Sequence, residues 1–306
     1  VEATVRAYAV RLRQQVLLSP LDAWYASIDS DDFIREAPTE PIRERRVAFV
    51  ERARHRTGDQ LVGKLVDATG PVPRFRHDGP NVSPLPADGL LAKRFRSVLA
   101  RYPESLSADR ATLLSRYRPA DMAMKTVGVA SVGTACGIAL YVSDGGDHLV
   151  LQLKEAGPSA LEAWSPEPPN PHHGQRVVFG QRLMQSASDV FLGWATDDEG
   201  HHYYVRQLRD MKTSLPPEEL EGPLLPRVGA LCGRALARAH AKGRDTAVVS
   251  GYVGSGSRLA TALAGFAARY ADQCERDFER FTKAVRAGLL PAASSAYPDV
   301  PGDGKE

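Results

Sequence analysis

The sequence is poor in asparagine and lysine. Among its 306 residues only Asn81 and Asn170 are asparagine, both in proline-rich loops, and eight residues are lysine against 31 arginines. A kinase-type catalytic loop needs an aspartate beside the substrate hydroxyl and an asparagine or second aspartate for magnesium. A standard Asp–Asn magnesium pair is therefore excluded within this chain. Because lysine is scarce, a lysine at the end of an apolar run needs a specific explanation.

Cysteine and long apolar runs are scarce as well. The three cysteines, Cys136, Cys232 and Cys274, are odd in number and far apart, so neither a disulfide framework nor a zinc knuckle is expected. No run approaches the ~18 apolar residues of a membrane span, and no signal segment opens the chain. We expect a cytoplasmic protein without a membrane partner. Because Val1 already lies in a helical pattern, we also expect a fragment, the later part of a longer protein.

What the sequence does contain is an ordinary globular composition. Hydrophobic residues make up 43% and charged residues 25%, with a formal net charge of +2. Residues 1–120 carry a net charge of +5 and residues 121–306 one of −3, so no overall basic field is present. Nucleic acid is therefore not an expected partner.

Residue periodicity divides the chain into three regions. Apolar residues recur at helical spacing in 1–120, alternate as in strands in 121–215, and return to helical spacing in 216–306. The expected fold class is α+β, a small sheet packed with mostly helical N- and C-terminal regions. A long helix over 257–287 is expected to bury its apolar residues, which are Leu259, Leu263, Phe266, Tyr270, Phe278, Phe281 and Val285.

The middle region is expected to hold five strands and one helix. Proline, glycine and aspartate crowd positions 69–89, which indicates a loop before this region. The strands are expected at 124–130, 135–142, 148–154, 190–195 and 203–208, with a helix at 175–187 after the third strand. A small five-stranded antiparallel sheet with one helix in that place is typical of the small lobe of a protein-kinase-like fold.

The turn between the first two expected strands is rich in glycine and small residues. Gly128, Ser131 and Gly133 leave its backbone open, so that its N–H groups can approach phosphate oxygens. The third strand is apolar and ends in Lys154, like the strand that carries the phosphate-binding lysine of a kinase. We expect these four residues to bind nucleotide, with Lys154 in the catalytic role. A strand-end lysine turned into solvent is the alternative.

The expected helix at 175–187 contains no glutamate, although a kinase places the partner of its lysine there. The candidates to orient Lys154 are instead Glu155, Glu162 and Gln181. Metal ligands stay unassigned, because the adjacent pairs His172–His173 and His201–His202 have no further ligand at suitable spacing.

Further polar residues follow the fifth expected strand. Arg206 and Arg209 are candidates to hold phosphate or carboxylate, and Asp210 is a candidate metal ligand, with surface ion pairs as the alternative. His240 and Asp245 stand at the end of the helix that would precede a kinase catalytic loop. No asparagine follows them, so we interpret this pair as structural or accessory.

Several long runs resemble one bacterial family. These runs are VGVASVGT (127–134), LQLKEA (151–156), GQRVVFGQRLMQSASDVFLGW (174–194), YYVRQLRDMK (203–212), ALARAHAKGRD (235–245) and YADQCERD (270–277). The family is catalogued as domain of unknown function 2252, and its members look kinase-like. Typically they carry upstream Gly-Asp-x-His-x-x-Asn and Asn-Asp-Phe-Asp segments, similar to those of aminoglycoside-type phosphotransferases, and this chain contains neither. It also departs from the family at Ala130 and Cys274.

The resemblance implies a nucleotide-binding part of a small-molecule phosphotransferase, incomplete and inactive as this fragment. ATP and Mg²⁺ are the implied cofactors, with the magnesium ligands outside this chain and an unknown small-molecule acceptor. Asp272 and Asp277, in the last of the shared runs, are candidate substrate or metal groups. The alternative is a non-catalytic nucleotide-sensing or protein-interaction module.

Overall fold

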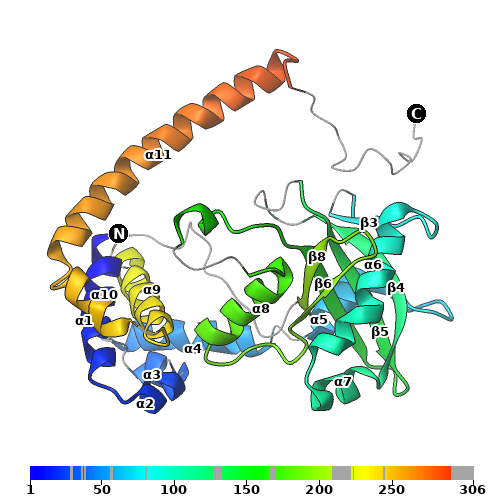
Figure 1. The fold of residues 1–306 in the computed structure, drawn as a ribbon, viewed down its shortest axis with the longest axis horizontal. Helices are drawn as coiled ribbons and strands as arrows, with labels where there is room; N and C mark the ends of the chain where they lie inside the picture. Colours follow the sequence, from blue (N-terminus) through cyan, green and yellow to red (C-terminus); the bar gives the residue numbers. More distant parts are fainter. Residues whose placement is uncertain are drawn as a thin grey trace. The chain divides into compact units, whose positions relative to one another are not determined.

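The computed structural model describes residues 1–27, 30–35, 37, 39–55, 58–79, 81–126, 128, 133–165, 170–208, 222, 224–243 and 245–290 (Figure 1). The fold is mixed α+β, as expected. The chain divides into two compact units. The helical unit comprises residues 1–48, 183–186 and the described part of 214–292, and the sheet unit comprises the described parts of 49–182 and 187–213.

Two helices that are far apart in the sequence form the core of the helical unit. Helix α1 (Glu2–Val16) packs along α9 (Leu224–His240). It buries Val5, Ala9 and Leu12, which recur at helical spacing. Gly233 of α9 makes the close approach possible, because a Cβ there would overlap the backbone of Thr4. The other elements of this unit are α2 (Pro20–Tyr25), α3 (Ser30–Arg35), the first half of α4 (Glu40–His55), α10 (Thr246–Val253) and α11 (Ser257–Arg286).

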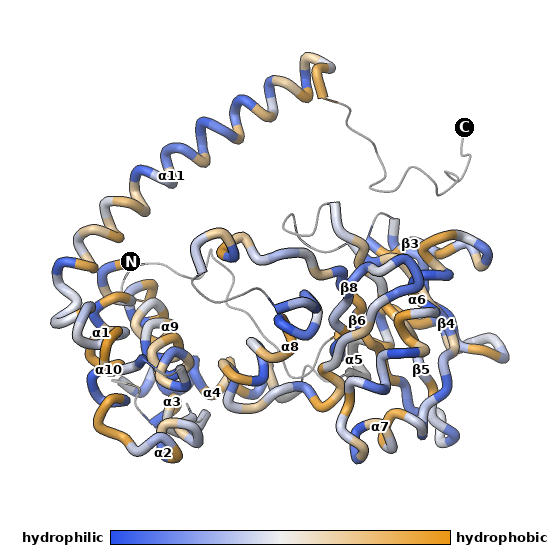
Figure 2. Tube along the Cα trace, in the orientation of Figure 1, coloured by the Kyte–Doolittle hydropathy of each residue, from blue (hydrophilic) through white to orange (hydrophobic). Residues whose placement is uncertain are grey.

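The long helix α11 differs from expectation in its burial. Its bounds are close to those predicted, but Ala260 is its one residue that is fully buried in the described structure. The aromatic residues that the periodicity assigned to a core are exposed, Phe266 by 55% and Phe278 by 68%. Apolar and polar residues alternate along the whole helix (Figure 2). The helical period therefore predicted which residues share one side of α11, but it did not predict whether that side is buried.

The sheet unit contains a six-stranded antiparallel sheet and a two-stranded one, so the expected five-stranded sheet was wrong. The order in the large sheet is β3-β4-β5-β6-β8-β7. Its strands are β3 (Val82–Pro84), β4 (Tyr117–Lys125), β5 (Cys136–Ser143), β6 (His148–Glu155), β7 (Gly193–Thr196) and β8 (His202–Gln207), and the small sheet pairs β1 (Val66–Asp67) with β2 (Arg74–Phe75).

Two of the additional strands, β2 and β3, lie where the sequence indicated a loop at 69–89. β3 has three residues and β2 has two, which is too short for a period of two to be recognised. Pro84 also lacks an N–H group, and a proline in a sheet is tolerated on an edge strand such as β3. β4 begins at Tyr117, and its pairing with β5 shifts in register between Pro119 and Asp121. The first half of β4 was therefore not predicted from the periodicity either.

Each face of the large sheet is covered by a different set of elements. Helix α6 (Leu90–Arg101), the 3₁₀ turn η1 (Tyr102–Ser105) and α7 (Ala108–Leu114) cover one face, with Phe95 and Tyr102 fully buried there. Phe95 lies so close to the sheet that a Cβ on Gly137 would overlap its ring. The opposite face packs Ile138 and Val150 against β1, β2 and the end of α5 (Gly58–Leu65).

Strand β6 contributes to both cores by simple alternation. Leu149, Leu151 and Leu153 point into the core beneath α6, and Val150 points into the core beside β1 and β2. Gln152 and Lys154 follow Val150 at intervals of two and therefore share its face. Beyond Val150, this second face of β6 therefore carries polar side chains.

The contact between Gly137 and Phe95 generates a stability prediction. Gly137→Ala should lower the free energy of unfolding by about 1–3 kcal/mol, because the added methyl group must displace a buried ring. Denaturant titration measures the change. Gly63→Ala is the matched control, since a Cβ there meets no atom within 4 Å and should leave stability unchanged or raise it. Adding Phe95→Leu to Gly137→Ala should recover part of the loss, and an equally stable Gly137→Ala variant would contradict this packing.

Candidate functional site

Sheet register brings residues at the ends of β4, β5 and β6 together at one end of these strands. Cys136, the first residue of β5, pairs with Lys154 of β6, and Lys154 pairs with Tyr204 of β8. On the other side of β5, Met124 pairs with Gly137, so Lys125 ends β4 beside Cys136. Residues opposite each other in a sheet share a face. This row therefore lies on the face of Ile138 and Val150, at its polar end.

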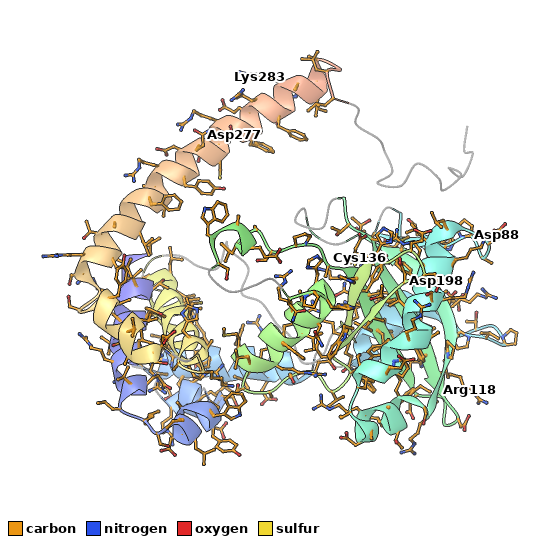
Figure 3. The ribbon with its side chains drawn as sticks, viewed as in Figure 1. Asp88, Arg118, Cys136, Asp198, Asp277 and Lys283 are labelled. Atoms are coloured by element: carbon orange, nitrogen blue, oxygen red, sulfur yellow. The ribbon has the colours of Figure 1, made fainter. Side chains whose placement is uncertain are left out.

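Three cations lie on the same sheet face as Cys136, and we call Lys125, Lys154 and Arg206 the cationic cluster. Burial raises the pKa of the Cys136 thiol, which is 1% exposed, while the positive charge of Lys154 is the first influence that acts in the opposite direction. Lys125 and Arg206 act in the same sense as Lys154. The position of the cationic cluster can be found in Figure 3 from the labelled Cys136 at the start of β5.

Gln152 connects Cys136 with Arg206 of the cationic cluster. Its Nε2 lies 3.7 Å from Cys136 Sγ, and its Oε1 accepts a hydrogen bond of 3.4 Å from Arg206 Nη2. The Nε of Arg206 is buried without a partner in the described structure. Gln152 is itself 3% exposed, so the amide is held firmly and directs the guanidinium. Arg206 thus retains an unused donor at the cluster.

No carboxylate among the described residues pairs with a member of the cationic cluster. Like charges at short range repel one another, and the repulsion grows when the surroundings exclude water. Clustered cations of this kind favour the binding of an anion. The described part of the site is therefore suited to an anionic ligand and offers it several donors.

The glycine-rich segment joins the two strands that border the cluster. It leaves β4 after Lys125 and enters β5 at Cys136. Gly133 has a φ of +84°, which favours glycine, and a Cβ on Gly128 or Gly133 would meet no atom within 4 Å. As far as the described residues go, the space beside both glycines is open. Ser131 lies outside the described residues, and so do Arg209 and Asp210.

The acidic residues considered as partners of Lys154 have other contacts. Glu155 follows Lys154 directly and so lies on the opposite face, where its Oε2 accepts a 2.9 Å hydrogen bond from Ala135 N. Glu162 accepts from Ser159 N at 2.8 Å and lies 3.9 Å from Arg176 Nε.

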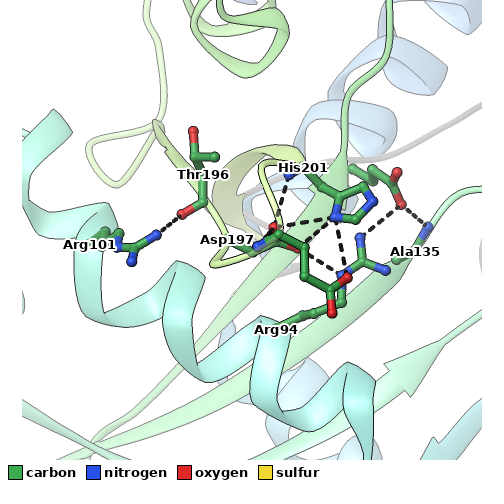
Figure 4. A network of polar contacts seen from close by, with 8 residues as sticks. Arg94, Arg101, Ala135, Thr196, Asp197 and His201 are labelled. Atoms are coloured by element: carbon green, nitrogen blue, oxygen red, sulfur yellow. Dashed lines mark hydrogen bonds and ion pairs between the residues drawn. The ribbon is translucent and has the colours of Figure 1, made fainter.

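A buried ionic network fixes the end of the glycine-rich segment from that opposite face (Figure 4). Arg94 of α6 lies 3.7 Å from Glu155 and donates from Nε to Asp197 at 2.7 Å. The Asp197 side chain is completely buried and also accepts from the backbone N–H groups of Glu199 and His201. Burial by itself raises the pKa of Asp197, but the hydrogen bond from Arg94 and those from the backbone lower it below its usual range. Asp197 is thus an ionised anchor between α6 and the β7–β8 turn.

The remaining predicted residues belong to the helical unit. His240 Nδ1 forms a 2.9 Å hydrogen bond with the Tyr8 hydroxyl, which joins α9 to α1. Asp245 stands at the start of α10 without a side-chain cap. Asp272 is exposed on α11, and Asp277 accepts a 2.9 Å hydrogen bond from Gln273 within the same helix (Figure 3).

Sequence reasoning missed Lys125, Gln152 and the central position of Cys136. A usable signal was present for Lys125, because the run Met122–Lys125 ends in lysine just before the first glycine, as the run Leu149–Lys154 ends in lysine. Within the described residues, no group of three or more histidine, cysteine, aspartate or glutamate side chains is arranged to hold a metal ion.

Residues 1–284 match the family model described as an uncharacterised protein conserved in bacteria, DUF2252. The chain belongs to this family. The resemblance noted from the shared runs is thereby confirmed. No curated protein and no solved structure matches the chain. None of the helices in the described part of this DUF2252 protein is both long and apolar enough to span a lipid bilayer.

Two histidines of the DUF2252 chain secure the start of α8 (His173–Met184). His172 Nδ1 accepts a 3.1 Å hydrogen bond from Gln175 N, as a capping side chain does. His202 Nδ1 accepts a 3.1 Å hydrogen bond from His173 N, and its ring stacks on that of His172 with centroids 4.0 Å apart. Both acceptor nitrogens must be unprotonated to make these contacts.

These contacts make the stability of the DUF2252 chain depend on pH. Burial lowers the pKa of His172 and of His202 below the ordinary 6.5, and the neighbouring histidines lower both further. The folded protein therefore binds fewer protons than the unfolded chain just below pH 6.5, and this stabilisation is present above that pH and is lost as the pH falls through the lowered values. Denaturant titrations between pH 7.5 and 5 should show the decline.

Asparagine offers an acceptor near the position of Nδ1 without titrating. The double variant His172→Asn, His202→Asn should therefore flatten this part of the stability profile. The exposed His77 provides the control, because His77→Asn should leave the slope unchanged. A double variant with the same slope as the original protein would contradict the assignment.

Proposed function

We propose that this chain binds the phosphates of a nucleotide, with ATP as the first candidate, at the cationic cluster and the glycine-rich segment. One observation carries the proposal: Lys125, Lys154 and Arg206 share one end of a sheet face and have no described carboxylate partner. A triphosphate supplies several negative charges at the spacing of neighbouring side chains. Guanidinium and ammonium groups bind phosphate through charge-assisted hydrogen bonds.

The order of elements supports a kinase-like arrangement. In protein kinases a glycine-rich loop covers the phosphates and the lysine stands on a following strand of the same sheet. Here the glycine-rich segment joins β4 to β5, and Lys154 stands on β6, which pairs with β5. The open space beside Gly128 and Gly133 suits close approach by a phosphate group. Lys154 would neutralise charge on the nucleotide, and Arg206, oriented by Gln152, would add a second contact.

Magnesium does not fit the described residues by themselves, because no carboxylate pairs with the cluster and no metal-ligand group is present among them. Hard divalent cations prefer carboxylate, carbonyl and water oxygens. We therefore assign no step to magnesium. Phosphates held by Lys154 and Arg206 are the part of a transfer site that this chain supplies, and a general base is not provided by the described residues near the cluster.

A non-catalytic nucleotide-sensing module is the second candidate, favoured by the positions of the two asparagines. Asn81 donates to Asp78 at 3.2 Å and Asn170 accepts from His172 N at 2.9 Å, so both have local structural contacts. A test with γ-labelled ATP shows whether this chain by itself turns the nucleotide over. Binding without transfer or hydrolysis is expected from this chain alone, and turnover that disappears in Lys154→Ala would show that it is a complete enzyme.

The binding proposal predicts a large effect of Lys154→Ala. Loss of one charge-assisted contact worth about 1.5–3 kcal/mol corresponds to an affinity about 10–100-fold weaker for a non-hydrolysable ATP analogue. Calorimetric titration measures this affinity. Lys93→Ala is the matched control, since Lys93 is exposed on α6, which covers the opposite face, and it should bind as the original protein does.

A second readout separates a lost ligand contact from a damaged fold. Removing one of three neighbouring positive charges relieves their repulsion, so Lys154→Ala should unfold at the same or higher denaturant concentration when no nucleotide is present. Equal affinity of the Lys154→Ala and original proteins would overturn the phosphate role. A variant that is less stable without nucleotide would instead indicate a structural role for Lys154.

A further inference from the structure

The exposed apolar side of α11 is the largest feature that the phosphate site leaves unexplained. The helix has 30 residues, and one of them, Ala260, is fully buried in the described structure. Its first turn contacts α1, where a Cβ on Gly256 would lie 2.7 Å from Ala9 Cβ. Phe266 and Tyr270 stack on each other at 5.6 Å and are more than half exposed. Contiguous exposed aromatic surface of this kind marks an interaction site.

The spacing of the apolar residues is symmetric along the helix, and we call this set the α11 stripe. It comprises Leu259, Leu263, Phe266, Tyr270, Cys274, Phe278, Phe281 and Val285, at intervals of 4, 3, 4, 4, 4, 3 and 4 residues. The intervals are the same when counted from either end. A second copy of α11, running in the opposite direction, therefore presents its stripe in register with this one.

We propose that the α11 stripe is the interface of a homodimer, in which two copies of the helix pack antiparallel about a twofold axis. In this register three pairs of residues from opposite copies lie at the same height along the axis. They are Leu263 with Phe281, Phe266 with Phe278, and Tyr270 with Cys274. The exposed part from Leu263 to Phe281 would form a contact about 28 Å long at 1.5 Å rise per residue. Such an isologous interface is the commonest kind in soluble oligomers.

Side-chain size favours the antiparallel direction. In that register Phe281 of one copy is level with the smaller Leu263 of the other, and Tyr270 is level with the smaller Cys274. Large and small side chains then meet across the interface, which fills space evenly. Parallel packing would oppose Phe281 to Phe281 and Tyr270 to Tyr270, and would leave a gap between the two Cys274 side chains.

Charge is complementary in the same register. At 3.6 residues per turn, Arg269 and Asp277 lie on the same side of the α11 stripe. In a twofold antiparallel pair, this side of one helix lies next to the same side of the other helix. Arg269 of one copy then lies two residue levels, or about 3 Å along the axis, from Asp277 of the other. In a parallel pair, Arg269 of one copy and Asp277 of the other would be separated by eight residues along the helix axis.

The polar side of α11 distinguishes a protein partner from a lipid surface. Helices that lie in a membrane interface carry a polar face rich in lysine and arginine. Here four acidic residues, Asp272, Glu275, Asp277 and Glu279, are interspersed with the basic residues of the second half. The mixed charge favours an aqueous assembly with a second copy of this chain.

The first test is the mass of the whole chain in solution, measured by sedimentation velocity between 5 and 100 µM. The original protein should be a dimer, and Phe266→Glu with Phe278→Glu should weaken dimerisation at least 100-fold without loss of helix content. Both residues are exposed, so folding should persist. The matched control is Arg276→Glu with Glu279→Arg on the polar side, which should remain dimeric. A monomeric original protein, or a dimer that the phenylalanine variants do not weaken, would overturn the proposal.

Cysteine cross-linking tests the direction of the helices. Chains with Cys232→Ser are mixed, one retaining Cys274 and the other carrying Tyr270→Cys with Cys274→Ser, and are treated with a mild oxidant. The antiparallel pair predicts that the cross-link joins the two different chains, because positions 270 and 274 are level. Preferential linkage between identical chains would indicate parallel helices and overturn the arrangement. Asp272→Cys in place of Tyr270→Cys is the control and should not cross-link.

Discussion

Side chains alternate along β6, and this alternation places Lys154 and Glu155 on opposite faces of the six-stranded sheet. Leu149, Leu151 and Leu153 are packed beneath α6, so a shift of the strand by one residue would expose all three. The hydrophobic core therefore fixes the direction of Lys154. It also separates the lysine from the neighbouring carboxylate, which would otherwise neutralise it.

Glu155 instead belongs to the ionic network that holds the backbone just before β5. It binds the backbone of Ala135 and lies near Arg94, which is held by the buried Asp197. The residue just after the glycine-rich segment is thus fixed from one face while the cationic cluster occupies the other. A buried ion pair contributes little net stability, but it positions the backbone, here at Ala135 just before β5.

The sequence was sufficient to predict the strands with a clear period of two, and the lysine that ends one of them. It did not reveal β3, because three residues that include a proline carry no periodicity. Lys125 was missed although its run ends in lysine just before the first glycine, as the run of Lys154 ends in lysine. The burial of α11 was also misjudged, since an apolar stripe has the same sequence pattern whether it meets a core or a second chain. Residues such as Gln152 acquire their role only from sheet register, which depends on pairing between distant strands.

The most direct test of the cationic cluster is the reactivity of individual lysines. Amine acetylation followed by mass spectrometry reports every lysine of the chain separately, so that Lys64 and Lys93, both exposed, serve as internal controls. Addition of a non-hydrolysable ATP analogue should slow the modification of Lys125 and Lys154 and leave the controls unchanged. Equal modification rates at Lys125 and Lys154 with and without saturating nucleotide would contradict the account.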